Sequence, residues 1–549
     1  MSSSVLVPLP VVLPLFGAGL TLVFGRSARA QRIISLAVLG IVVIVAATLL
    51  GRADAHGPQV VEVGGWPAPL GISLVADRLS ALMLLVSAVV SLCVLVYSLG
   101  QGVVEYGRDT PLSVYHPTFL VLVAGVANAF LSGDLFNLYV GFEVLLAASY
   151  VLLTLGGTGA RIRAGTTYVV VSLLSSVVFL AAIALVYAAT GTVNLAHLAL
   201  RLDDLPDGVS LVLQLMLLTA FSIKAAVFPL SAWLPDSYPT APAPVTAVFA
   251  GLLTKVGVYA IIRTQTLLFP DSPLTDLLMW AALLTMVVGI LGAVAQSDIK
   301  RMLSFTLVSH IGYMVFGVAL ATVGALSGAI FYVVHHITIQ TTLFLVAGLI
   351  ERRGGSTALD RLGGLARLAP VLAVLFFVPA MNLAGIPPFS GFLGKLGLLQ
   401  AGVDNGSWLA YTLVAGGVIT SLLTLYAMAK AWNRAFWQAP PDHLEAAELG
   451  VYDDPGEAVA DDGDTGGALH GEPVRQLTRD RSADSVSGDG AVDHRRMPAA
   501  MIWPAAALVA IGVGLTVVAG PLFDITDRAA TDLLERTPYI DAVLPDGAP

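Results

Sequence analysis

Proline and glycine interrupt apolar, helix-forming sequence in two stretches, Phe228-Pro229-Leu-Ser-Ala-Trp233-Leu-Pro235-Asp236 and Ala384-Gly385-Ile-Pro387-Pro388-Phe-Ser-Gly391-Phe-Leu-Gly394-Lys395. Because proline removes a backbone donor and clashes with the preceding turn, helix geometry must break in both. Inside a membrane, unwound backbone is tolerated only where protein or water covers it, and broken helices in the two halves of a transporter indicate its ion path. A single proline kink is common in membrane helices, but two breaks, each next to a lysine, favour a functional interpretation.

The composition around these stretches is that of a membrane protein. Hydrophobic residues make up 56% of the chain and charged residues 12%, with a mean hydropathy of +0.84, whereas ordinary soluble domains have roughly 25% charged residues. Apolar runs of membrane-spanning length recur from Val5 to Leu522, and counting them predicts about fourteen spans. Runs such as Ile33–Leu50 and Met501–Val518 lack the alternation of a membrane β-barrel. We therefore predict an all-α polytopic membrane protein.

The sequence offers no cofactor motif. The single cysteine, Cys93, lies in an apolar run, which excludes a disulfide framework or a cysteine-based metal site. Nucleotide fingerprints, iron–sulfur cysteines and haem motifs are also missing from the sequence, so we expect no cofactor. The first segment has no basic region and is followed by arginines rather than a small-residue cleavage site, so we expect a first span and not a cleaved signal peptide.

Lysine and arginine gather in alternate loops, the pattern that orients membrane proteins. The intervening loops are acidic or neutral, as at Asp54–Glu62, at Asp203–Asp207 and after Pro521. This alternation predicts an even number of spans with both termini outside. An insert rich in Asp, Gly and Ser, Gln438–Pro498, is predicted to be a disordered cytoplasmic loop. The basic loops, predicted to be cytoplasmic, carry Arg26, Arg29 and Arg32; Arg108; Arg161 and Arg163; Lys300 and Arg301; Arg352, Arg353, Arg361 and Arg367; and Arg475–Arg496.

Ionisable residues within the apolar spans are the candidate functional residues, because a charge at mid-bilayer costs at least ~2.5–3.5 kcal/mol. Glu143 and Lys224 are interpreted as a pair whose separation would switch the lysine between holding and releasing a proton; the alternative is a structural ion pair. Lys255 and Lys395 have no carboxylate in their own spans, so we expect them to be neutral or beside water, as a relay requires. The full set is Glu143, Lys224, Lys255, His310, His335, His336, Lys395 and Lys430.

The histidines of this set titrate near physiological pH. His335 and His336 are therefore interpreted as a bridge between two lysines through water. Adjacent helical residues point about 100° apart, which disfavours shared metal ligation, so no metal site is predicted. His310 is either a packing residue or part of the relay. Lys430 is expected to reach the cytoplasmic interface, with the inner mouth of the path as the alternative.

Several of these stretches resemble the antiporter-like membrane subunits shared by respiratory complex I and the Mrp (multisubunit) cation/proton antiporters. The most specific is Phe221-Ser-Ile-Lys224-Ala-Ala-Val-Phe-Pro229-Leu-Ser-Ala-Trp233-Leu-Pro235-Asp236-Ser-Tyr-Pro-Thr-Ala-Pro242, continuing to Lys255. Within the family, Gly64–Ile72 and Val75–Leu82 look most like the D-type subunits of Mrp antiporters. Supporting matches are Asp134-Leu-Phe-Asn-Leu-Tyr-Val-Gly-Phe-Glu143, Ser297-Asp-Ile-Lys300-Arg-Met-Leu-Ser-Phe-Thr-Leu-Val-Ser-His310 and Gly385-Ile-Pro-Pro-Phe-Ser-Gly391-Phe.

The resemblance implies a fold of about fourteen helices with two inverted five-helix repeats, each containing a broken helix. It implies a proton-conducting subunit of a multisubunit Na⁺/H⁺ antiporter in the bacterial inner membrane, which exports Na⁺ at the expense of the proton-motive force. The partners implied are other antiporter subunits, protons, Na⁺ and lipid, and no nucleic acid. The implied divisions are N-terminal helices at 1–110, a first repeat at 111–265, a second repeat at 266–433, a cytoplasmic loop at 434–498, and a last helix with an outside tail at 499–549.

The resemblance also bears on individual residues. Glu143, Lys224, Lys255 and Lys395 match the proton-translocating residues of the family, and they are the side chains that polarity selects. The chain departs from the family at Gln340, where D-type subunits carry a lysine in a His-x-Ile-x-x-Lys-Thr pattern. Glutamine passes a proton only through water, so the central relay would rest more heavily on the neighbouring histidine pair.

Two other functions stay open at this point. The first is a proton-pumping membrane subunit of an NADH–quinone oxidoreductase or a membrane-bound hydrogenase, whose redox chemistry would lie in partner subunits. The second is a structural scaffold that has lost transport. The scaffold predicts no penalty beyond stability when Glu143 or Lys224 is neutralised.

Overall fold

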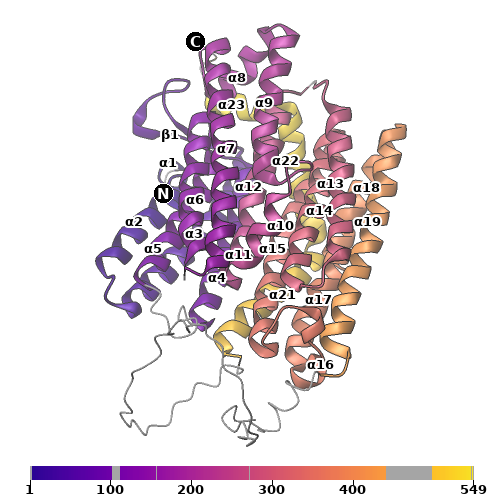
Figure 1. The fold of residues 1–549 in the computed structure, drawn as a ribbon. Coiled ribbons are helices and arrows are strands. Elements are labelled where there is room, and N and C mark those ends of the chain that lie inside the picture. The colour runs from indigo at the N-terminus through magenta and orange to yellow at the C-terminus, as the bar shows by residue number, and fades with distance from the viewer. Residues whose placement is uncertain are drawn as a thin grey trace, which may run out of the picture.

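The computed structural model describes residues 3–101, 112–155, 157–270, 272–440, 497–545 and 547. Within these ranges, twelve helices are long and apolar enough to cross a membrane. They stand side by side in one bundle (Figure 1). Two further apolar helices, Leu9–Val23 and Pro370–Ala384, are shorter, at 15 residues each. The all-α polytopic fold is confirmed, while about fourteen spans stays a prediction, because a bilayer core needs roughly 20 residues per span.

The first half of the chain builds one side of the bundle and a small hairpin (Figure 1). A π-helical turn, Phe249–Leu253, joins its last two helices. The elements are α1 (Ser3–Leu6), α2 (Leu9–Val23), α3 (Ala28–His56), β1 (Gln59–Glu62), β2 (Ser73–Ala76), α4 (Arg78–Gln101), α5 (Leu112–Leu131), α6 (Leu135–Thr154), α7 (Gly159–Thr190), α8 (Leu195–Arg201), α9 (Asp207–Ala225), α10 (Trp233–Ser237), α11 (Ala243–Val248) and α12 (Thr254–Leu267).

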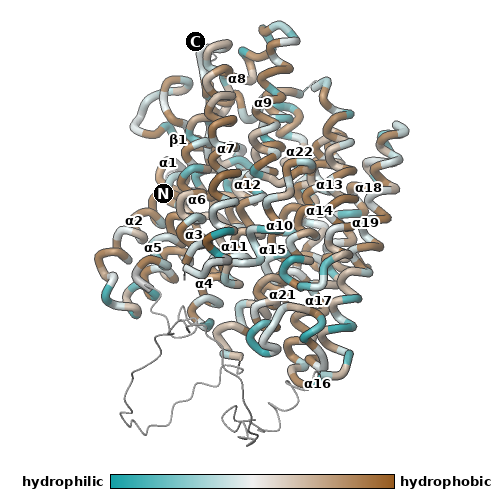
Figure 2. The backbone as a smooth tube through the Cα atoms, in the orientation of Figure 1, coloured by the Kyte–Doolittle hydropathy of each residue, from teal (hydrophilic) through white to brown (hydrophobic). Residues whose placement is uncertain are grey.

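The second half places the long helices α14 and α15 at the centre, where they and α12 of the first half are almost completely buried. Hydrophobic residues follow the lengths of the helices, and hydrophilic residues gather in the connections near α16 and α17 (Figure 2). The elements are α13 (Thr275–Ala295), α14 (Ile299–Leu320), α15 (Val323–Gly354), α16 (Leu365–Leu368), α17 (Pro370–Ala384), α18 (Ser390–Asn405), α19 (Trp408–Trp432), α21 (Ala499–Val517), α22 (Ala519–Glu535) and α23 (Thr537–Val543).

Both predicted helix breaks are present. The first separates α9 from α10, and there the indole nitrogen of Trp233 donates to the carbonyl oxygen of Ile223 at 3.1 Å. The second separates α17 from α18, where the backbone nitrogen of Gly391 donates to Oδ1 of Asn382 at 2.9 Å. Side chains therefore satisfy backbone groups that the broken helices release, as a low-dielectric interior requires.

Two helices at opposite ends of the bundle, α6 and α14, begin in the same way, with a capping aspartate that also forms a β-bridge. Asp134 caps α6 and forms a β-bridge with Asn194, and Asp298 caps α14 and forms a β-bridge with Ala358. Each bridge joins positions 60 residues apart, 134 to 194 and 298 to 358. The first lies beside α8 and the second near α16, which Figure 1 places at opposite ends.

Three local features differ from the sequence-based expectation. Strands β1 and β2 form an antiparallel hairpin, with Val60 opposite Val75, although helices alone were predicted. The stretch after Pro521, expected to be an outside tail, contains most of α22, which begins at Ala519, and all of α23. The π-helical turn Asn433–Trp437 covers the first residues of the segment 434–498 that was predicted to be a loop, and directly after it the backbone nitrogen of Gly364 donates to the carbonyl oxygen of Gln438 at 2.7 Å. The rest of that loop, 441–496, and Arg108 lie outside the described residues.

Candidate functional site

Glu143 on α6 and Lys224 on α9 are brought together by a serine. The hydroxyl of Ser176, on α7, donates to Oε1 of Glu143 and accepts from Nζ of Lys224 at 3.3 Å. The ammonium also lies over the ring of Phe142, 4.8 Å from its centroid. The sequence predicted the carboxylate and the lysine but missed Ser176, since serines are frequent in this helix.

A small cavity adjoins the buried Lys224. It has a volume of about 20 Å³ and is lined by residues of α7, α9 and α10 and by Leu253, two residues before Lys255. The hydroxyl of Tyr238 is buried and has no hydrogen-bond partner in this part of the structure. A water needs about 10–15 Å³ and two or more polar partners, so the cavity can hold one water between the two lysines' helices.

Lys255 is fully buried at the π-helical turn of the α11–α12 segment. Its Nζ donates to the carbonyl oxygen of Ala250 at 2.7 Å. The turn packs closely against α15, because a Cβ atom added at Gly251 would lie only 2.2 Å from Oγ1 of Thr341 on that helix. π-Helical turns are often found at functional sites, and this one sets the lysine close to the histidine-bearing helix.

The histidines form a cluster at the centre of the bundle. The rings of His310 and His336 have centroids 5.3 Å apart, and Nδ1 of His310 lies 2.9 Å from the hydroxyl of Tyr332. Among the described residues, neither ring nitrogen of His336 has a hydrogen-bond partner, nor does Nε2 of His335. The structure therefore places His310 within the cluster, although the sequence left it between packing and relay.

Lys395 lies on α18, beyond the second helix break, and is also buried. Its Nζ donates to the carbonyl oxygens of Leu383 and Ala384 at 3.0 and 3.1 Å. His335 contacts the start of the same helix, with its Nδ1 3.0 Å from Oγ of Ser390. The broken helix thus links the histidine cluster to the last lysine.

Two other residues that the sequence singled out have different surroundings. Nζ of Lys430 donates to the carbonyl oxygens of Val294 and Gln296, at 2.9 and 2.8 Å, where α13 ends. A lysine that binds the last carbonyls of a helix stabilises that end of the helix, here the end of α13.

Gln340 is fully buried. Its Nε2 donates to the carbonyl oxygen of Leu303 at 2.7 Å, while its Oε1 has no partner in the described structure.

Within the described ranges, no group of three or more His, Cys, Asp or Glu side chains could hold a metal ion. The half-buried Glu143 instead offers a carboxylate, and the buried Lys224, Lys255 and histidines offer amines and imidazoles within the bundle. Groups of this kind bind and release protons, and the unpartnered ring nitrogens leave places for water. Three further buried charged residues were not singled out from the sequence: Asp77, Asp134 and Arg263. The signal for Arg263 was a lone arginine inside the apolar helix α12.

Residues 132–424 match the family described as "NADH:quinone oxidoreductase/Mrp antiporter, TM". This match covers more than half of the chain. The chain belongs to this family. Residues 63–100, which include β2 and nearly all of α4, also match "NADH-Ubiquinone oxidoreductase (complex I), chain 5 N-terminus".

Named relatives place the chain among the Mrp-type members. It is 41% identical to the D-type subunit of the Na⁺/H⁺ antiporter of Alkalihalophilus pseudofirmus over 450 residues, which cover 81% of this chain and 90% of the relative. Its fold is similar to a chain of the Mrp complex from Dietzia sp., with 34% identity, a TM-score of 0.85 and 99% of each chain covered. It is also similar to a chain of an archaeal membrane-bound sulfane sulfur reductase, with 25% identity, a TM-score of 0.82 and coverage of 98% and 100%.

Proposed function

We propose that this chain is a proton-conducting subunit of a multisubunit Na⁺/H⁺ antiporter, which uses the proton-motive force to export Na⁺. The names of the relatives and the likeness to a chain of an Mrp complex support this function. We further propose the bacterial cell membrane as its location, with both termini outside. The alternation of basic and acidic loops supports that orientation.

The single observation that carries the proposal is the Glu143–Ser176–Lys224 contact within the membrane helices. A lysine in a low dielectric stays charged only while a nearby carboxylate or a hydrogen-bonded hydroxyl stabilises its ammonium group. Movement of Glu143 away from Ser176 would release the Lys224 proton. The adjoining water-sized cavity then offers it a way toward Lys255.

From Lys255 the proposed route continues through the histidine cluster. A water beside His336 would pass the proton across α15, because both ring nitrogens of His336 are without partners in the described structure. His335 and Ser390 would then carry it to the broken helix and Lys395. Gln340, which cannot hold a proton, would only orient water here, so the route depends on the histidines.

We propose the division into two repeats, 111–265 and 266–433, between N-terminal helices at 1–110 and a loop and last helix at 434–498 and 499–549. The equal spacing of the two capping bridges, at opposite ends of the bundle, supports an inverted repeat. The two broken helices, each close to a buried lysine, support it as well.

The redox-pump function is less favoured. A sulfane sulfur reductase chain shares the fold, so the fold alone does not separate the two functions. The deciding experiment uses everted vesicles that carry the whole complex, with a pH gradient made by ATP hydrolysis and respiration blocked. Dissipation of this gradient by added Na⁺ is expected for an antiporter. Proton movement that appears only with an electron donor would contradict the proposal and favour the redox pump.

A further inference from the structure

A second charged cluster lies on the same helix as Lys255, toward the end of the bundle that carries α8 and the hairpin (Figure 1). Arg263 lies eight residues after Lys255 on α12, about 12 Å along a helix axis, with Tyr259 between them. An ion pair of 2.6 Å joins Nη2 of Arg263 to Oδ2 of Asp77, and the two side chains are 3% and 8% exposed. Charges so deeply buried in a membrane protein are a functional hypothesis by default.

The ion pair borders a cavity of about 10 Å³ that Asp532 and Tyr539 also line. The guanidinium of Arg263 lies 4.9 Å from the centroid of the Tyr539 ring. Nε of Arg263 and the hydroxyl of Tyr539 are buried, and both are without hydrogen-bond partners in the part of the chain that the structure describes. Buried polar atoms of this kind are normally satisfied by water, and the cavity, which Asp77 also lines, has the volume that one water needs.

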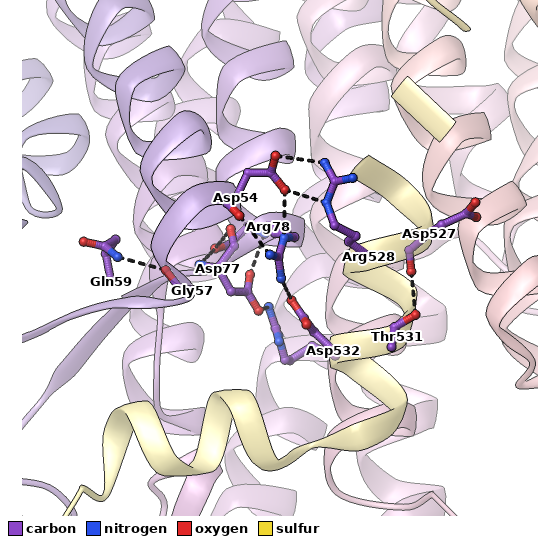
Figure 3. Close-up of polar contacts among 11 residues, drawn as sticks. Asp54, Gly57, Gln59, Asp77, Arg78, Asp527, Arg528, Thr531 and Asp532 are labelled. Atoms are coloured by element: carbon purple, nitrogen blue, oxygen red, sulfur yellow. Dashed lines mark hydrogen bonds and ion pairs between the residues drawn. The ribbon is translucent and has the colours of Figure 1, made fainter. Parts of the chain in front are cut away.

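The C-terminal helices close this cavity from the outer side. Arg78 contacts both Asp54 and Asp532, and Arg528 binds Asp54 at 2.8 Å, which fastens α22 to α3 and α4 (Figure 3). The same helix crosses the start of α15. There the ring of Phe523 stacks on Phe331 with centroids 4.2 Å apart. Helices α22 and α23 therefore cover the ends of both α12 and α15, the helices that carry Lys255 and the histidines.

We propose that Asp77 is a further proton-accepting residue of this protein, the outermost on the path, and that Arg263 is its positioning residue. The inference rests on the proposed function and extends its route to the outer surface. A proton that arrives through water binds Oδ2 of Asp77 and weakens its ion pair with Arg263, which keeps its own charge throughout. When the proton leaves through the cavity, the carboxylate is restored and the ion pair forms again, so each cycle returns the site to its starting state.

A purely structural role is the rival explanation for Asp77. Its Oδ1 accepts from the backbone nitrogen of Ser80 at 2.8 Å, so the carboxylate caps α4. A buried ion pair is by itself weak evidence of function. The distinguishing observation is that Asp77 and Arg263 line a water-sized cavity together with Tyr539, and that Nε of Arg263 and the hydroxyl of Tyr539 have no hydrogen-bond partner among the described residues. A helix cap does not require this feature.

The test compares Asp77→Asn with the double variant Asp77→Asn/Arg263→Gln in the complete complex. Asparagine caps a helix as well as aspartate, but it leaves Arg263 unpaired, and the double variant removes both charges. We expect both to lower Na⁺-evoked proton exchange in everted vesicles by at least about tenfold at equal complex content. Asp77→Glu should keep part of the activity. A double variant that exchanges at the wild-type rate would overturn the proposal and leave a structural ion pair.

Two controls make the result specific. Lys300→Gln/Glu351→Gln removes another interhelical ion pair, of 2.6 Å, and should keep exchange near the wild-type rate; a loss equal to that of the Asp77 double variant would overturn the specific role. Glu143→Gln is measured in the same vesicles. If Glu143→Gln is inactive while the Asp77 double variant is active, the inference fails and the proposed function stands. If both are active, the proposed route itself fails.

Discussion

Asp134 provides a prediction whose size follows from the structure. This carboxylate lies between α5 and α6, outside the spanning segments, and is 5% exposed. Burial raises its pKa from 3.8 to about 6, although hydrogen bonds from the backbone nitrogens of Asn137 and Phe136 oppose the change. A carboxyl group whose pKa is raised by folding stabilises the fold only below its unfolded pKa, and that contribution is lost as the pH rises through about 6.

The perturbation is Asp134→Asn, which keeps the helix cap and removes the buried charge. The difference between a pKa of 3.8 and one of about 6 corresponds to about 3 kcal/mol. We therefore expect the variant to be more stable than wild type by up to about this amount at pH 8, and equal to it at pH 4.

The assay is thermal unfolding of the purified complex in detergent, followed by intrinsic fluorescence at pH 4, 6 and 8. The midpoint of the variant should rise above that of wild type as the pH increases. Exchange activity should be retained, unlike in Glu143→Gln on the same helix. A wild type and a variant with the same pH dependence would refute the argument that Asp134 carries a burial cost.

Two further predictions concern the relay. Ser176→Ala removes the hydroxyl between Glu143 and Lys224 and should lower Na⁺-evoked exchange about tenfold or more. Ser176→Thr, which keeps a hydroxyl, should retain most of the exchange. Equal rates in the two variants would show that the hydroxyl bridge is dispensable. His336→Gln replaces an imidazole that can carry a proton by an amide that cannot, and it should lower exchange about 100-fold while the complex assembles normally. The same change at the exposed His56 should have no effect. Wild-type exchange in His336→Gln would remove this residue from the route.

The fold was largely predictable from the sequence because membrane helices follow from simple physical limits. Long apolar runs give spans, and the prolines around Pro229 and Pro388 give the two breaks, which the structure places between α9 and α10 and between α17 and α18. The β1–β2 hairpin was not predicted because strands of four residues leave little periodicity. Helix α22 was missed because an amphipathic helix that packs back on the bundle has no spanning-length apolar run.

The lysines, the glutamate and the histidines of the candidate site were predictable from the sequence, and the hydroxyl side chains that contact them were not. Glu143, Lys224 and Lys255 stand out in apolar sequence because charges are rare there. Ser176 and Tyr332 do not stand out, because hydroxyl side chains are common in membrane helices and only their positions in space give them a role. Asp77 directly precedes α4 and Arg263 lies in the last turns of α12, far from it in the sequence, so only the tertiary structure could show their contact.

The central claim is that the Glu143–Lys224 pair moves protons, and its most direct test is Na⁺-evoked dissipation of a pH gradient in everted vesicles that carry the whole complex. Wild type is compared with Glu143→Gln and Lys224→Ala, with Glu535→Gln as the matched change at an exposed carboxylate on α22, and complex content is measured in each. We predict that exchange is lost in the first two variants and kept in the third. Exchange that survives in both Glu143→Gln and Lys224→Ala would contradict the account and leave the Glu143–Lys224 pair a structural contact.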